Sequence, residues 1–182
     1  MPDQPSSSSP SNGPPYGVPF GPSPGAGITP VRGYFAIGAE RISKALNLGN
    51  IMRSGNAFGA AFTFTIGASY QALEARADTS KGQWHIPHYN WGSIDEIALP
   101  NGCKLVGIEL TENAVDLPSF MHPMRAAYVL GPERGSLSDE LLARCDQVVK
   151  IPTRFCINVA MAGAIVMYDR VRSRAPGPRL PG

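Results

Sequence analysis

Short apolar runs that alternate with helix-like stretches constrain the fold of this 182-residue chain more than any other feature. Such runs, without a polar residue at every second position, are typical of strands buried on both faces of a parallel sheet. A strand followed by a helix, repeated along the chain, predicts an α/β fold with a mostly parallel sheet flanked by helices. The predicted strands are residues 34–37, 62–66, 104–110, 126–130 and 147–150, and the predicted helices are residues 48–58, 93–99, 138–144 and 159–171.

Local signals mark the ends of these elements. Asn47 is a candidate N-cap for the first long helix, and Gly59 is a candidate terminator. Pro152 ends the last predicted strand because it has no backbone N–H to donate. Asn158 is then a candidate N-cap for the closing helix.

Proline divides the chain unevenly, because nine of its 18 prolines fall within residues 1–30. That segment has few apolar side chains and one charged residue, so it is predicted to be a disordered or extended N-terminal arm. Residues 31–174 are predicted to form the folded domain. Residues 175–182 repeat the proline and glycine pattern and are predicted to be a short tail.

The composition is nearly balanced in charge, with 16 basic and 14 acidic residues, so a nucleic-acid partner has to be argued from local sites. The three cysteines form no CxxC motif, which favours a reduced, intracellular protein without a metal. The longest apolar run, residues 159–168, is about half of what a membrane-spanning helix needs. A soluble, cytoplasmic protein without a membrane partner is therefore expected.

Residues 78–91 have no periodicity and are predicted to be a long loop, a kind of segment that is often functional. This segment is rich in aromatic side chains. They either stack on unpaired RNA bases or pack over the sheet. The side chains are Trp84, His85, His88, Tyr89 and Trp91.

A first motif, residues 47–59, follows the first strand and contains Asn47 and Arg53. Ligands of open α/β sheets bind beyond the carboxyl ends of strands, which is where this motif begins. The two side chains are six residues apart and share no face of a regular helix. Arg53 is thus either a ligand-binding residue or a solvated surface residue.

Two further motifs lie after later strands. Residues 130–138 place Glu133 between two glycines, where the backbone can approach a ligand, although a tight turn also explains the glycines. Residues 151–158 lead into a helix that starts with small residues. Those small residues indicate either core packing or a subunit interface.

Taken in this order, the three motifs resemble the SpoU, or TrmH-like, branch of the SPOUT RNA methyltransferases, over most of residues 31–174. The resemblance implies a homodimer that transfers a methyl group from S-adenosylmethionine to a ribose 2′-hydroxyl of tRNA or rRNA. It also implies a C-terminal deep trefoil knot. The family's catalytic residues match Asn47, Arg53, Glu133 and Asn158.

The resemblance implies cofactor contacts from the loops that follow three strands, and no metal. Relatives commonly have serine where this chain has Cys156, which removes a hydroxyl but leaves a backbone contact possible. The implied S-adenosylmethionine-binding residues are Leu110, Leu130, Gly131, Ile151, Cys156 and Ile157.

The chemistry assigns a separate role to each matched residue. A guanidinium has a pKa above about 12, so Arg53 is better suited to gripping a phosphate and stabilising a developing alkoxide than to acting as a base. Asn47 and Asn158 are expected to orient the arginine and the ribose. Glu133 is expected to hold either the Arg53 side chain or the third motif.

Basic residues near the first motif and near the C-terminus are candidates for further RNA contacts, or are ordinary solvated side chains. They are Arg32, Arg41, Lys44 and Arg53, and Arg170, Arg172, Arg174 and Arg179.

Three other functions remain open at this stage. The first is methylation of an RNA base on the same fold, and the second is a catalytically silent RNA-binding or assembly factor. The third is an unrelated nucleotide-binding α/β module.

Overall fold

The structure is a computed structural model of the chain and describes residues 33–69, 72 and 86–174. The predictions for residues 1–30 and 175–182 lie outside the described residues, as do those for Arg32, Trp84, His85 and Arg179.

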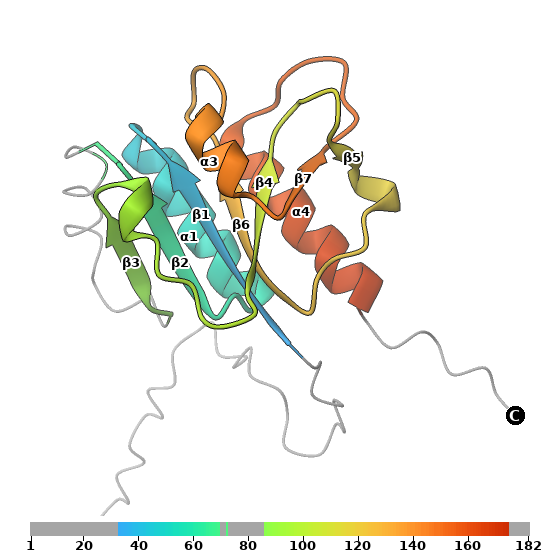
Figure 1. The fold of residues 1–182 in the computed structure, drawn as a ribbon, viewed down its shortest axis with the longest axis horizontal. Helices are drawn as coiled ribbons and strands as arrows, with labels where there is room; N and C mark the ends of the chain where they lie inside the picture. The colour runs from blue at the N-terminus through green and yellow to red at the C-terminus, as the bar shows by residue number, and fades with distance from the viewer. Residues whose placement is uncertain (1–32, 70–71, 73–85, 175–182) are drawn as a thin grey trace, which may run out of the picture. The chain divides into compact units, whose positions relative to one another are not determined.

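Seven parallel strands form one sheet in the order β3-β2-β1-β6-β4-β7-β5, which confirms the predicted α/β fold with a parallel sheet (Figure 1). The last strand in sequence, β7, lies between β4 and β5, which are consecutive in the chain. The strands are β1 (Tyr34–Glu40), β2 (Phe62–Ile66), β3 (His88–Trp91), β4 (Lys104–Ile108), β5 (Val115–Asp116), β6 (Arg125–Leu130) and β7 (Gln147–Lys150).

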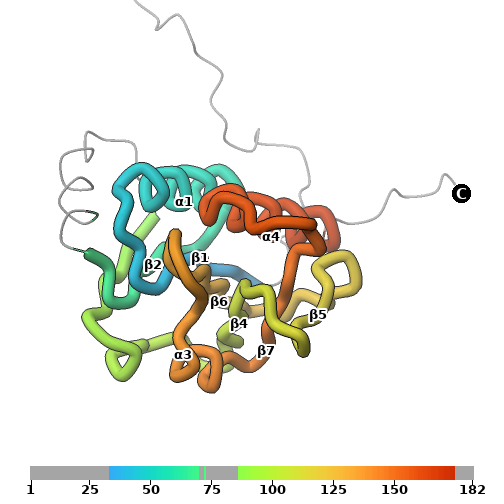
Figure 2. The backbone as a smooth tube through the Cα atoms, turned by 90° about the horizontal axis from the view of Figure 1, so that it is seen from above, coloured from blue at the N-terminus to red at the C-terminus, as the bar shows by residue number. Residues whose placement is uncertain are grey.

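Helices cover both faces of the sheet. On one face α1 (Ala45–Phe58) and α4 (Val159–Arg174) lie side by side, and the short α3 (Asp139–Arg144) lies on the other (Figure 2). Short 3-10 turns occur at Ile94–Glu96 and Leu117–Ser119. Among the described elements, the sequence predicted α1, α3 and α4, although α1 begins three residues earlier than expected and α4 extends three residues further.

The period-two geometry of the central strands divides the core between these faces. On β6, Tyr128 and Leu130 pack with side chains of α1 and α4, whereas Val129 packs with Leu137 and Leu141 around α3. All five side chains are almost completely buried, so β6 is apolar on both faces as its sequence predicts.

The segment predicted as a loop at residues 78–91 contains an edge strand, so that prediction is wrong for its last four residues. Here β3 pairs with β2, and Trp91 packs on the ring of Phe64 with 5.2 Å between centroids. Tyr89 is half exposed and stacks on Trp91 at 6.3 Å and 10°. Trp91 therefore belongs to the core, whereas Tyr89 remains 48% exposed.

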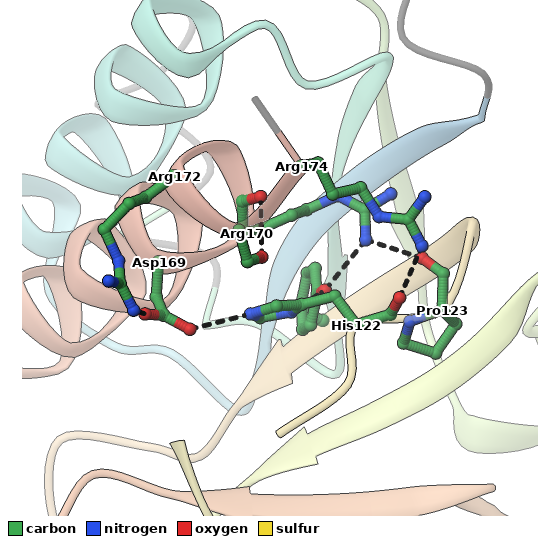
Figure 3. Close-up of polar contacts among 8 residues, drawn as sticks. His122, Pro123, Asp169, Arg170, Arg172 and Arg174 are labelled. Atoms are coloured by element: carbon green, nitrogen blue, oxygen red, sulfur yellow. Dashed lines mark hydrogen bonds and ion pairs between the residues drawn. The ribbon is translucent and has the colours of Figure 1, made fainter. Parts of the chain in front are cut away.

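One of the predicted RNA-contacting arginines, Arg170, is instead a buried structural residue, only 4% exposed. Its guanidinium donates a hydrogen bond to the carbonyl oxygen of Pro123 at 2.7 Å (Figure 3). It donates two more, to the carbonyl oxygens of Met124 at 2.9 Å and Tyr34 at 3.0 Å. It also donates to the hydroxyl of Tyr128 at 3.0 Å. Arg170 thereby fastens α4 to the segments that enter β1 and β6.

A buried histidine completes this cluster. His122 lies between the Tyr128 hydroxyl, 2.6 Å from Nδ1, and the Asp169 carboxylate, 3.0 Å from Nε2. Burial lowers the pKa of His122, although Asp169 opposes that shift, so the neutral imidazole donates to Asp169 and accepts from Tyr128. Arg172 pairs with the other oxygen of Asp169 at 3.0 Å on the exposed side of α4 (Figure 3).

Within the described residues, no helix is both long and apolar enough to cross a lipid bilayer. The same part of the chain contains no cluster of three or more His, Cys, Asp or Glu side chains suited to a metal ion.

Candidate functional site

A cavity of about 320 Å³ opens at the carboxyl ends of β4, β6 and β7. Its walls come from the loops that follow these three strands and from the start of α1. All six predicted cofactor-binding residues line it, although they come from three separate parts of the sequence. They are Leu110, Leu130, Gly131, Ile151, Cys156 and Ile157.

Three of the four predicted catalytic residues, Asn47, Glu133 and Asn158, also line this cavity. Asn158 Nδ2 donates to Asn47 Oδ1 at 3.1 Å, and Asn47 Nδ2 donates to Glu133 Oε1 at 3.1 Å. The three side chains therefore form one continuous hydrogen-bonded row along one wall of the cavity.

Asn158 has a second task at the start of α4. Its Oδ1 accepts hydrogen bonds from the backbone N–H groups of Ala160 at 2.9 Å and Met161 at 3.3 Å. This geometry confirms the predicted N-cap, and it fixes the amide so that its nitrogen faces Asn47.

The predicted N-cap role of Asn47 is wrong, because α1 begins at Ala45 and Asn47 lies within its first turn. The start of the helix is held instead by Glu133 from the loop after β6. Its two oxygens accept from the backbone N–H of Ser43 at 3.0 Å and of Lys44 at 2.8 Å. A carboxylate from a distant loop thus takes the place of a local cap, and its negative charge interacts favourably with the positive N-terminal end of the helix dipole.

These contacts set the charge of Glu133. Burial raises its pKa, but the hydrogen bonds from the Lys44 and Ser43 backbone and from the Asn47 side chain outweigh burial and lower the pKa to about 2. Glu133 is consequently ionised throughout the neutral range and acts as a permanent hydrogen-bond acceptor.

Arg53 does not join this row. It lies on α1 with its side chain exposed, does not line the cavity, and makes no hydrogen bond or ion pair with the other described residues. The expectation that Glu133 holds Arg53 is wrong, since that carboxylate is occupied by Ser43, Lys44 and Asn47.

The cavity wall also contains three charged residues, Lys44, Glu109 and Lys150. The sequence analysis named Lys44 only as a candidate RNA contact, and it missed Glu109 and Lys150. Each of them lies just before a helix or at the end of a strand, the positions where open sheets bind ligands. That positional signal was available in the sequence, but no motif distinguished these residues from ordinary surface charges.

The model of the SpoU rRNA Methylase family matches residues 34–168, which include the whole cavity wall. The chain belongs to this family.

Similar proteins agree with the SpoU assignment. The chain is 27% identical over 153 residues to the mouse tRNA (guanosine(18)-2'-O)-methyltransferase TARBP1, which covers 76% of this chain and 9% of that protein. It is 24% identical over 141 residues to the tRNA (guanosine(18)-2'-O)-methyltransferase of Escherichia coli K12, with coverages of 74% and 62%. The chain thus spans less than two thirds of the length of either relative.

Among solved structures, the chain resembles the SpoU methyltransferase AviRb from Streptomyces viridochromogenes in complex with AdoMet. The TM-score is 0.69 at 25% identity, and the match covers 80% of this chain and 60% of AviRb. The described sheet, with helices on both faces, therefore resembles the fold of this SpoU methyltransferase over most of the chain.

Proposed function

We propose that this SpoU-family protein is an S-adenosylmethionine-dependent RNA 2′-O-ribose methyltransferase that acts on tRNA or rRNA, with residues 31–174 as its catalytic domain. One observation carries the proposal. The cavity brings the six expected cofactor residues together with the row formed by Asn47, Glu133 and Asn158, inside the region that matches the family.

The cavity suits the proposed cofactor. Leu110, Leu130 and Ile151 supply apolar wall, and Gly131 lets the backbone come close to a bound molecule. Cys156 lines the cavity with its side chain exposed, so a backbone contact is available there in place of the serine hydroxyl of relatives. When bound, S-adenosylmethionine would supply the methyl group of its sulfonium. The ribose 2′-oxygen would accept this methyl group, and the 2′-hydroxyl would lose its proton.

The protein's own residues would orient the nucleotide. Asn47 and Asn158 present polar side chains to the cavity, and Glu133 fixes them by holding the start of α1. We assign Arg53 to a phosphate next to the target ribose, because its guanidinium is exposed and can bind two oxygens at once. Tyr89, with its exposed ring, is proposed to stack on an unpaired base.

A homodimer is part of the proposal, because large exposed apolar side chains lie within three residues of Asn47 and Asn158 in the sequence. Leu46 is 75% exposed, Met161 is 58% exposed, and Phe155 is 82% exposed. Leu46 and Met161 lie in the first turns of α1 and α4, so a second copy that covers them would also border the cavity.

The knotted topology is supported by the strand order. The chain that leaves β4 passes to β5 at the edge of the sheet and returns to β6, and β7 lies inside that excursion. After β7 the chain crosses to α4 beside α1. We propose that this crossing threads the C-terminal segment through the loop formed by β4, β5 and β6, which would make the trefoil knot. We also propose that the enzyme is cytoplasmic and meets its RNA in the cytoplasm.

The test is methyl transfer from labelled S-adenosylmethionine to RNA from cells that lack this gene, followed by nucleoside analysis. Label in 2′-O-methyl nucleosides is expected, with a loss of at least about 100-fold for Arg53→Ala, as for removal of other groups that stabilise developing negative charge. Arg144→Ala is the matched control, because Arg144 is an exposed helical arginine that pairs with Asp95 away from the cavity.

The alternative functions give different results in this experiment. Label in a modified base would mean that the protein methylates a base and not the ribose. RNA binding without cofactor binding or transfer would favour a silent assembly factor and overturn the enzymatic proposal.

A further inference from the structure

The loop of residues 131–138 leaves the sheet from β6, which lies between β1 and β4 (Figure 1), and its first part, up to Gly135, forms one rim of the cavity. A loop that leaves a central strand can be held from both neighbouring strands. Here it is held from both, at three consecutive residues near its end, Ser136, Leu137 and Ser138.

The contacts from β1 lie outside the cavity wall. The buried Glu40 at the end of β1 accepts from the backbone N–H of Ser138 at 2.8 Å and from its hydroxyl at 2.5 Å. The next residue, Arg41, donates to the carbonyl oxygen of Ser136 at 3.0 Å. Neither Glu40 nor Arg41 lines the cavity.

The contact from β4 is different, because Glu109 itself lines the cavity. One oxygen, Oε2, accepts from the backbone N–H of Leu137 at 2.8 Å. The other, Oε1, accepts from the backbone N–H of Leu110 at 2.8 Å. A single carboxylate therefore joins the rim formed by the 131–138 loop to the rim that follows β4.

This carboxylate also lies against Gly131, a proposed cofactor contact. A Cβ on Gly131 would come within 3.1 Å of Leu137 N and 3.5 Å of Glu109 Oε2. Within the part of the chain that the structure describes, no cationic side chain forms a salt bridge with Glu109. Its two oxygens accept from the backbone N–H groups of Leu110, which lines the cavity, and of Leu137, two residues beyond the lining part of its loop, and not from an ion-pair partner.

We propose that Glu109 is a positioning residue that sets the spacing between the two rims of the cofactor cavity. The inference rests on the proposed methyltransferase function and deepens it, because it assigns cofactor affinity to a side chain outside the three sequence motifs. Glu109 joins the backbone of the two loops that border the cavity, so its loss is expected to open the cavity without removing any of the proposed RNA-contacting groups.

Glu109→Gln is the sharpest variant, because it replaces one carboxylate oxygen by an NH₂ group of the same size. A glutamine can accept only one of the two backbone N–H groups and turns a donor toward the other. Glu40→Gln is the matched control on the same loop. There the amide oxygen can accept from Ser138 N and the amide NH₂ can donate to the Ser138 hydroxyl, so both hydrogen bonds survive.

The experiment measures the Kd of S-adenosylhomocysteine by calorimetry, and kcat and both KM values by methyl transfer, with folding checked by circular dichroism. For Glu109→Gln we expect Kd and the KM for S-adenosylmethionine to rise about tenfold, as for one lost hydrogen bond to a charged group. The KM for RNA and kcat are expected to change less than about threefold, and Glu40→Gln to bind as the wild type. Glu109→Asp, which keeps both acceptors, is expected to bind more tightly than Glu109→Gln.

Unchanged cofactor affinity in Glu109→Gln, or an equal loss in Glu109→Gln and Glu40→Gln, would overturn the inference while leaving the methyltransferase function intact. A loss of folding in Glu109→Gln and Glu109→Asp alike would also overturn it, in favour of a purely structural role. A wild-type protein that binds neither S-adenosylmethionine nor S-adenosylhomocysteine would instead refute the proposed function itself.

Discussion

Asn158 Nδ2 donates a hydrogen bond to Asn47 Oδ1 at 3.1 Å and links the start of α4 to the first turn of α1 across 111 positions of sequence. Because Asn158 Oδ1 also caps α4, the side chain has one atom for helix stability and another for the site. Substitutions can therefore separate the two tasks.

Asn158→Ala is expected to lose both tasks, whereas Asn158→Ser keeps a good capping oxygen but is too short to reach Asn47. Loss of the cap costs about 1 kcal/mol of the free energy of unfolding, so Asn158→Ala should be the less stable variant in urea titrations. Both variants should lose methyl transfer to the same extent. Full activity in Asn158→Ser would show that the link to Asn47 has no part in the reaction.

The depressed pKa of Glu133 makes a pH-dependent contribution to stability. Since its folded pKa is about 2 and its ordinary value is 4.5, the contribution is fully present above about pH 4.5 and is lost as the pH falls through about 2. Glu133 is half-buried, so we expect about 1–2 kcal/mol after allowance for solvent screening.

Urea titrations of the wild type and Glu133→Gln measure this contribution. The difference in unfolding free energy should be constant from pH 5 to pH 7 and should shrink below about pH 4.5. A difference that does not vary with pH would mean that the hydrogen bonds to Ser43 and Lys44 do not depend on the charge.

Arg170→Met is expected to destabilise the fold strongly, because it removes the guanidinium donor to the carbonyl oxygens of Pro123 and Tyr34, whereas Met124 O still accepts from the Tyr34 backbone N–H at 3.0 Å. Buried polar groups without partners cost about 1–3 kcal/mol each, so we expect a total of at least about 2 kcal/mol. Arg172→Ala is the control two positions away, since its pair with Asp169 is exposed and should change stability by less than about 1 kcal/mol. Thermal denaturation of both variants tests this difference.

The sequence predicted the core of the sheet because its central strands, such as β6, are apolar on both faces and give a continuous signal. The edge strands gave none. In β3, His88, Tyr89 and Asn90 are half-buried or exposed, and β5 has only two residues. Their pairing depends on a neighbouring strand, which a local pattern does not contain.

The site shows the same division. The cap role of Asn158 is predictable from sequence because its partners, Ala160 and Met161, are only two and three residues away. The start of α1 is not predictable in this way, because Glu133, which accepts from the backbone N–H of Lys44, lies 89 positions away in the sequence. A local pattern therefore favours Asn47 as the cap, which is wrong. Arg170 has the composition of a surface residue, and its burial follows from carbonyl groups that lie 46 and 136 positions away in the sequence.

The position of β7 between β4 and β5 has a consequence for how the protein is made. A ribosome releases the chain from its N-terminus, so β1 to β6 are synthesised before the strand that completes the sheet. The wall from Lys150 to Ala162, with Asn158 in it, is among the last parts of the described chain to emerge. A nascent chain that stops before this wall has most of its sheet but lacks one side of the cavity, so the proposed cofactor site forms only after the segment that follows β7 has been synthesised.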